Sequence, residues 1–160
     1  MTTGTTTEAS PPDLTAAIGS GMTAAVPFAR TLGVVFREIS PDHAVVVLPD
    51  RGDLHNHVGG PHAGVLFSLA ETASGAVVLA AFGTGLDRWT PLAYHAEASY
   101  RAVATGEVSA EATLGRPADE VRAEFDATGK AKFPVSVTVR DAAETITTEV
   151  TVTWALRANR

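Results

Sequence analysis

The longest apolar stretch of the chain, residues 63–86, constrains the fold more than any other feature of the sequence. Scattered serines, threonines, glycines and one glutamate make it too polar for a membrane span, and it predicts a buried helix over about residues 62–83. Because this helix is apolar nearly all round, other elements must cover it on every side. The economical cover is an antiparallel β-sheet wrapped around a long central helix, an α+β architecture.

Alternating apolar and β-branched residues predict strands on both sides of this helix. The turn signature Ser40-Pro41-Asp42 joins the first two strands into a hairpin, and Gly129 ends a later helix over 118–128. A further helix is expected from about 14 to 24, with a short helical turn from Pro27. The expected strands cover residues 33–39, 43–48, 92–101, 106–114, 133–139 and 146–156. We therefore predict a single domain over residues 14–160, preceded by a disordered tail over residues 1–13.

Composition and charge argue against several classes of protein. The chain has no cysteine, which excludes a disulfide scaffold and a thiolate metal site. Its net charge is −6 with only two lysines, so neither nucleic acid nor a membrane surface is an expected partner, although a small anionic ligand needs only one or two local cations. The N-terminus has no basic region or apolar core typical of a signal peptide, so a cytoplasmic location is expected.

Glu71 is the only acidic residue between Asp53 and Asp87, and it lies midway along the most apolar segment. Burying an ionised carboxylate without partners is costly, so such a residue either faces solvent or serves a function. One interpretation places Glu71 on a polar stripe with Ser68, Thr72 and Ser74. The other gives a partly desolvated carboxyl group with a raised pKa, suited to act as a general base on water or as a nucleophile.

Small residues surround the start of the predicted helix, from Gly59 to Gly64. They would let a ligand approach the free backbone N–H groups of the first turn, where the helix dipole favours negative charge. Such a helix start can form an oxyanion hole for a thioester or an ester. A glycine-rich loop that merely turns is an equally simple interpretation.

Three histidines, His55, His57 and His62, cluster just before this helix. They could bind zinc or iron, but no Asp or Glu stands at a convincing ligand spacing, so no metal is expected. The isolated His43 and His95 are expected to be solvated or structural. Three arginines could meet a phosphate or lie solvated on the surface: Arg88, Arg101 and Arg116.

Two stretches together resemble the hotdog-fold acyl-CoA thioesterases, of the phenylacetyl-CoA-pathway and 4-hydroxybenzoyl-CoA types. The first is Asn56, five residues, and then His62-Ala63-Gly64; the second runs from Leu66 to Ala73 and contains Glu71. Tyr100-Arg101 is similar to the aromatic-Arg ending of the family's third strand. The resemblance covers residues 30–157, and the insert over 118–132 looks like that of a less characterised hotdog branch.

This resemblance implies hydrolysis of a small or medium acyl-CoA without any cofactor, coenzyme A being part of the substrate. Glu71 would be the catalytic base or nucleophile, the Ala63 N–H would polarise the thioester carbonyl, and Asn56 would orient water or the carbonyl. His62 matches the histidine at the family's helix start. Ala63 stands where the family prefers glycine, so a methyl group faces the acyl path. Substrate contacts are expected from Gly64, Ser74 and Arg101.

Eight residues separate Ala63 from Glu71, or about 12 Å along a helix, so one helix cannot present both groups to one carbonyl. Two antiparallel helices related by a two-fold axis could, so we expect a homodimer, or a dimer of dimers, with the site at the dimer interface. The main alternative is a non-catalytic acyl-CoA-binding or structural hotdog protein. A dehydratase or hydratase fits less well, because the interval from His62 to Glu71 does not match. A metal enzyme built on the histidine loop is a further alternative.

Overall fold

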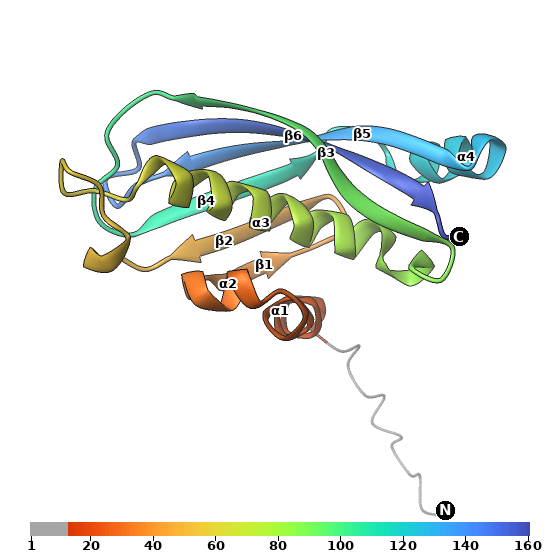
Figure 1. The fold of residues 1–160 in the computed structure, drawn as a ribbon, viewed down its shortest axis with the longest axis horizontal. Coiled ribbons are helices and arrows are strands. Elements are labelled where there is room, and N and C mark those ends of the chain that lie inside the picture. The colour runs from red at the N-terminus through yellow and green to blue at the C-terminus, as the bar shows by residue number, and fades with distance from the viewer. Residues whose placement is uncertain (1–12) are drawn as a thin grey trace, which may run out of the picture.

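A computed structural model describes residues 13–160, so the expected tail over residues 1–13 lies almost wholly outside the described residues. Six strands form one antiparallel sheet that curves around the helix α3, as the sequence predicts (Figure 1). The helices are α1 (Leu14–Ala25), α2 (Pro27–Leu32), α3 (Ala63–Phe82) and α4 (Ala118–Thr128). The strands are β1 (Val35–Ile39), β2 (His43–Leu48), β3 (Trp89–Tyr100), β4 (Val108–Leu114), β5 (Lys130–Arg140) and β6 (Ile146–Ala158).

The helix α3 forms the centre of the hydrophobic core. Nearly all of its second half is buried, and Phe82 at its end packs against Phe133 of β5 with ring centroids 4.9 Å apart. The segment Ala63–Gly85 is apolar and long enough to cross a membrane by composition, but 67% of its most apolar stretch is buried inside this fold. Its hydrophobicity is therefore accounted for by the sheet that covers it.

The strand order in the sheet is β1-β2-β4-β5-β6-β3, which leaves β1 and β3 at the two edges. The helix α1 covers the β1 edge: the hydroxyl of Thr15 accepts a hydrogen bond from the Ile39 N–H at 3.0 Å. Gly19 of α1 allows this close approach, because a Cβ atom there would lie 3.1 Å from the Phe36 ring. At the other edge β3 pairs with β6 alone among the described strands.

The boundaries of several strands differ from the predicted ones by a few residues. β3 begins at Trp89 and β6 ends at Ala158, because these two residues are register partners at the end of a long ladder. β5 begins directly after Gly129, whose φ of 71° ends α4 in the left-handed conformation that glycine favours. Pairing with a neighbouring strand thus extends β3, β5 and β6 beyond their predicted ends, whereas β1 and β4 begin two residues later than predicted, at Val35 and Val108.

Candidate functional site

The helix α3 begins at Ala63, one residue after the predicted start, and His62 caps it. The Nδ1 atom of His62 accepts a hydrogen bond from the Gly64 N–H at 2.9 Å. The N–H of Gly64 is therefore occupied, whereas no acceptor among the described residues bonds the N–H of Ala63. Ala63 is exposed, so its N–H is the helix-start donor that can reach a ligand.

A groove of about 360 Å³ lies beside this helix start. Asn56, Ala63 and Arg101, which the sequence places in the site, line it together with Leu66 and Tyr100. The Tyr100 hydroxyl donates a hydrogen bond to the Ala63 carbonyl at 3.1 Å, which ties the end of β3 to the first turn of α3. Tyr100 is absent from the predicted site residues, although its place beside Arg101 in the family-like motif could have indicated it.

The side chain of Asn56 organises the loop that leads into α3. Its Oδ1 accepts hydrogen bonds from the N–H groups of Val58 at 2.9 Å and Gly60 at 3.4 Å. Gly60 has no room for a side chain, because a Cβ atom there would lie 2.1 Å from the Ala104 carbonyl oxygen. In this protomer Asn56 therefore shapes the wall of the groove, and its oxygen is already engaged by the loop backbone.

The carboxyl group of Glu71 is partly buried on α3 and has no hydrogen bond or ion pair with any described residue. Burial raises its pKa. The polar-stripe interpretation fits poorly, because Thr72 is buried and its hydroxyl bonds the Ser68 carbonyl within the helix. A half-buried carboxyl group without partners is the arrangement that functional carboxylates show.

Ser74 and Arg101, two of the expected substrate-binding residues, are engaged within the protomer. Ser74 is fully buried; its hydroxyl donates to the Glu71 carbonyl at 2.7 Å and accepts from Trp154 Nε1 at 3.0 Å. The Ser74 hydroxyl is therefore not free to contact a substrate in this protomer. Arg101 is exposed at the groove, and its Nε donates to Glu149 at 2.7 Å.

The histidine loop does not gather a metal site, since no group of three or more His, Asp or Glu residues suited to a metal occurs among residues 13–160. His55 instead bonds Asp50 at 2.7 Å, and His62 caps α3. Arg88 and Arg116 pair with Asp126 and Glu124.

A larger groove of about 760 Å³ lies between α1 and β1, but the residues that line it include none of the predicted site residues. Although this groove is larger, the smaller groove is the candidate site, because the free helix-start N–H and the predicted polar residues lie there. Glu71, His62, Gly64 and Ser74 do not line that smaller groove either. One protomer thus brings Asn56, Ala63 and Arg101 together, and Glu71 lies apart from them.

The antiparallel sheet wrapped around α3 defines a hotdog fold, as the solved structures similar to this chain also show. A Pseudomonas aeruginosa protein of unknown function, described as a probable thioesterase, has a TM-score of 0.78 and 24% identity over 90% of this chain and 96% of that chain. A Chlorobaculum tepidum protein of unknown function matches with a TM-score of 0.77 and 15% identity over 91% and 95%. A thioesterase from Staphylococcus aureus matches with a TM-score of 0.67 and 19% identity over 82% and 99%.

Residues 15–156 match the model of the DUF4442 family, a domain of unknown function, and the chain belongs to that family. This agrees with the less characterised hotdog branch that the insert over 118–132 indicates. No curated protein matches the chain. At these identities the likeness to solved structures establishes the fold, and the activity has to be argued from the site.

Proposed function

We propose that this protein is a cytoplasmic thioester hydrolase that acts on a small or medium acyl-CoA. The observation that carries the proposal is Glu71, a half-buried carboxyl group with a raised pKa and no partner among the described residues. The Ala63 N–H would stabilise the oxyanion that forms as the thioester carbonyl is attacked. Glu71 would activate water or attack the carbonyl itself. The likeness to a probable thioesterase and to a thioesterase supports this reaction class.

The proposed site is shared between two copies of the chain. Glu71 and Ala63 are eight residues apart on one straight helix, about 12 Å along its axis, so they cannot act on one carbonyl within one protomer. Antiparallel packing of α3 against α3 of a second copy would place Glu71 of one protomer opposite Ala63 of the other. The edge strand β3, which pairs with β6 alone among the described strands, supports such a homodimer, or a dimer of dimers.

Replacing Glu71 tests the proposal. The Glu71→Gln and Glu71→Ala variants should lower kcat for acyl-CoA hydrolysis by at least about a hundredfold, because a positioned acid–base group contributes 10²–10⁴-fold. Hydrolysis would be followed by the release of free thiol across a series of acyl chain lengths. If Glu71 acts as a base, kcat in the wild type rises with pH through a pKa above 4.5, because only the ionised form accepts a proton.

The matched control is Ser68→Ala on the same helix, since the Ser68 hydroxyl bonds only the Gly64 carbonyl of its own helix at 2.7 Å. Its activity should equal that of the wild type. Wild-type turnover no faster than that of Glu71→Ala would contradict the hydrolase proposal. A non-catalytic acyl-CoA-binding protein would then be favoured, a second candidate that the methyl group of Ala63 on the acyl path supports.

A further inference from the structure

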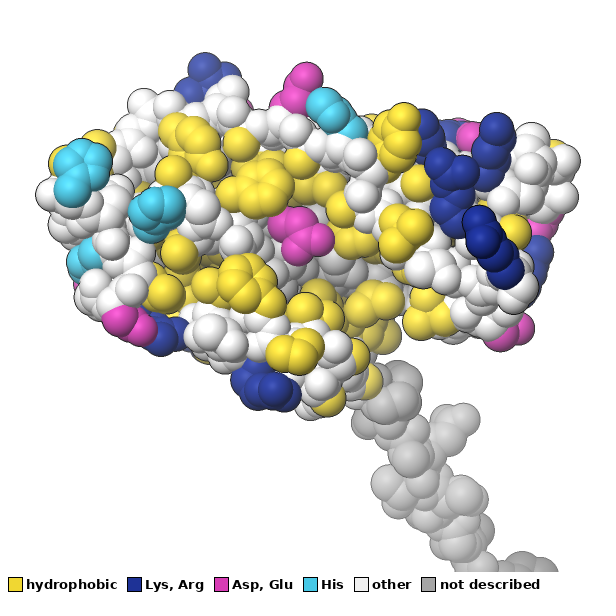
Figure 2. Space-filling model, in the orientation of Figure 1, with side chains coloured by type: hydrophobic (Ala, Val, Ile, Leu, Met, Phe, Trp, Pro, Cys, Tyr) yellow, Lys and Arg dark blue, Asp and Glu magenta, His cyan; other side chains and the backbone are white. Residues whose placement is uncertain are grey.

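Both lysines of the chain stand at the start of β5, at Lys130 and Lys132. Arg157 of β6 is the register partner of Lys130, so three cations lie together in a chain whose net charge is −6. We call these three residues the basic cluster. Figure 2 shows Lys and Arg side chains gathered at the end of the molecule where β6 ends and α4 lies. Such a local concentration of positive charge needs an explanation.

The basic cluster has no anionic partner among the described residues. None of its three cations forms an ion pair, whereas Arg51, Arg88, Arg101 and Arg116 each pair with a carboxylate. Glu124 lines the same hollow as the three cations, and its carboxylate is bonded to Arg116 at 2.7 Å. Neighbouring like charges repel one another, and a bound anion would relieve that repulsion.

The basic cluster lines a small hollow of about 210 Å³ together with Glu124, Ala131 and Ala155. Ala155 is the register partner of Lys132. The ammonium group of Lys132 lies 3.3 Å from the centroid of the Tyr94 ring on β3. Hydrogen bonding to Lys132 and its positive charge lower the pKa of the Tyr94 hydroxyl, and the charge of Arg157 adds to this effect. A compact hollow with convergent cations matches a phosphate group better than a broad protein surface.

The basic cluster lies next to the edge at which a second copy would join the sheet. Tyr94 belongs to β3, and Arg157 pairs directly with Thr90 of the same strand. If β3 paired antiparallel with β3 of a second copy, the Tyr100 end of that copy would approach the Trp89 end of this one. Since Tyr100 bonds Ala63, the helix start of the second copy would come near this end of the first copy's β3, on the α3 side of the sheet. Lys130 and Lys132 alternate with Phe133, which packs on α3, so the basic cluster lies at the same edge on the other face.

We propose that Lys130, Lys132 and Arg157 bind the phosphate groups of coenzyme A in the thioester substrate. This inference rests on the proposed thioester hydrolase. The phosphate-bearing end of coenzyme A would be held at the basic cluster, away from the reacting carbonyl. The flexible pantetheine arm would link the phosphates at the basic cluster to the thioester at the helix start of the other protomer. A thioester on an acidic carrier protein would be a different substrate class, and the small hollow favours the nucleotide phosphates of CoA.

The test combines direct binding with hydrolysis, using the full chain. In the double variant Lys132→Gln/Arg157→Gln, the Kd for CoA measured by calorimetry should rise at least about tenfold, because charge-assisted contacts to phosphate are lost. The KM for acyl-CoA should rise by a similar factor with kcat nearly unchanged. The KM for the same acyl group on pantetheine, which lacks the nucleotide phosphates, should not change. The charge-preserving variant Lys132→Arg/Arg157→Lys should bind CoA within about threefold of the wild type.

The matched control is Arg37→Gln, which removes an exposed cation from β1 at the opposite edge of the sheet and should leave the Kd for CoA unchanged. A Kd for CoA that is the same in the double variant and the wild type would overturn the inference. So would a double variant that impairs hydrolysis of an acyl carrier protein thioester but not of acyl-CoA. If the wild-type protein binds CoA through the basic cluster but hydrolyses no thioester, the phosphate-binding inference stands and the proposed hydrolase activity is wrong.

Discussion

Glu71 and His43 are two ionisable side chains whose pKa the fold raises, and the causes are different. Burial raises the pKa of Glu71, because desolvation disfavours the charged carboxylate. Hydrogen bonding to Glu111 raises the pKa of His43 against the opposing effect of burial, and the charge of Glu38 contributes further. The first shift fits a group that takes part in a reaction, and the second fits a group that stabilises the fold.

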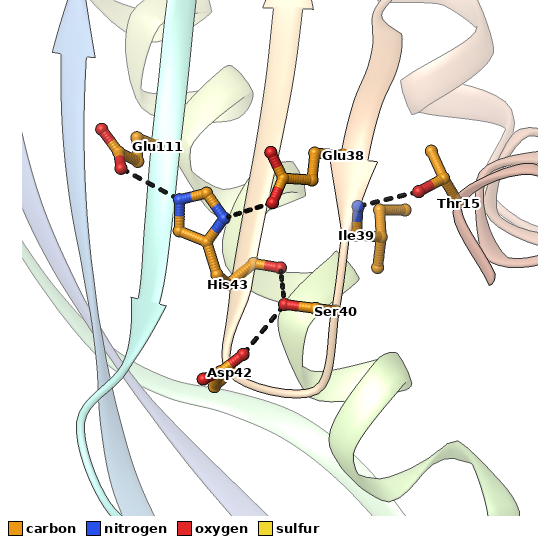
Figure 3. A network of polar contacts seen from close by, with 7 residues as sticks. All are labelled: Thr15, Glu38, Ile39, Ser40, Asp42, His43 and Glu111. Atoms are coloured by element: carbon orange, nitrogen blue, oxygen red, sulfur yellow. Dashed lines mark hydrogen bonds and ion pairs between the residues drawn. The ribbon is translucent and has the colours of Figure 1, made fainter.

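His43 links three neighbouring strands on the surface of the sheet (Figure 3). Its Nε2 lies 2.9 Å from Glu111 on β4, and its Nδ1 lies 3.3 Å from Glu38 on β1. Both ring nitrogens can donate to carboxylates only when the imidazole is protonated. His43 is isolated in the sequence, because Glu38 lies on the preceding strand and Glu111 lies 68 residues further along the chain. Only the strand register brings the three side chains together.

We predict that His43 stabilises the protein below neutral pH. Because its folded pKa lies above the unfolded value of 6.5, its contribution is fully present below that pH and disappears as the pH rises through the folded pKa. The free energy of unfolding of the wild type should exceed that of His43→Gln by about 0.5–1 kcal/mol near pH 5.5, since the partners are largely exposed. Urea unfolding from about pH 5.5 to 9 measures this difference. A difference that stays constant or grows with pH would contradict the prediction.

At the scale of elements, α3 is held against β6 by a polar contact inside an apolar core. The Ser74 hydroxyl accepts a hydrogen bond from Trp154 Nε1, and both residues are buried. The same hydroxyl donates to the Glu71 carbonyl, so the contact fixes the helix turn that carries the proposed catalytic residue. The Trp154 ring also packs beside Gly75, the next residue of the helix, where an added Cβ atom would lie 3.7 Å from the ring, an ordinary contact distance.

Ser74→Ala should therefore destabilise the fold by about 1–3 kcal/mol, because the Trp154 N–H would be buried without an acceptor. Urea unfolding monitored by tryptophan fluorescence would measure the loss. Ser68→Ala, which removes a hydroxyl that bonds only its own helix, is the control and should change the free energy of unfolding by less than about 0.5 kcal/mol. Equal losses of unfolding free energy in the two variants would show that the hydrogen bond between Ser74 and Trp154 does not stabilise the fold.

At the scale of the whole molecule, the two edges of the sheet are unequal. The β1 edge is covered by α1, whereas β3 is twelve residues long and pairs with β6 alone among the described strands. Large apolar side chains on β3 stay exposed, Tyr94 at 58% and Tyr100 and Leu92 at 50%. Figure 2 shows hydrophobic side chains gathered on the face of the molecule that α3 crosses. An apolar edge strand of this length, with no second neighbour among the described strands, favours pairing with a second copy.

We predict that Ala98→Glu converts the proposed dimer into monomers, because it places a charge on β3 beside that edge. Sedimentation velocity at micromolar concentration would measure the change, and acyl-CoA hydrolysis should fall together with the dimer fraction. Ser136→Glu adds the same charge to an exposed position of β5, inside the sheet, and should leave the dimer intact. A wild-type protein that is monomeric yet hydrolyses thioesters normally would contradict the shared site.

Local sequence signals predict the order of helices and strands and the fold class. The period of two in β3, β5 and β6, the turn at 40–42 and the stop at Gly129 are local signals, and each matches the structure. The continuous apolar helix also required a sheet around it, since exposing its surface to water would be unfavourable. Local signals are sufficient for these features because they depend on neighbours in the chain.

Which distant polar groups meet, and which stay free, follows from tertiary packing. The Ser74 hydroxyl meets Trp154 of β6, and His43 meets Glu111 of β4. Glu71 and the basic cluster have no ion-pair partner among the described residues, and β3 pairs with β6 alone among the described strands. These contacts depend on strand order and register, which bring together residues tens of positions apart, so no local pattern in the sequence encodes them.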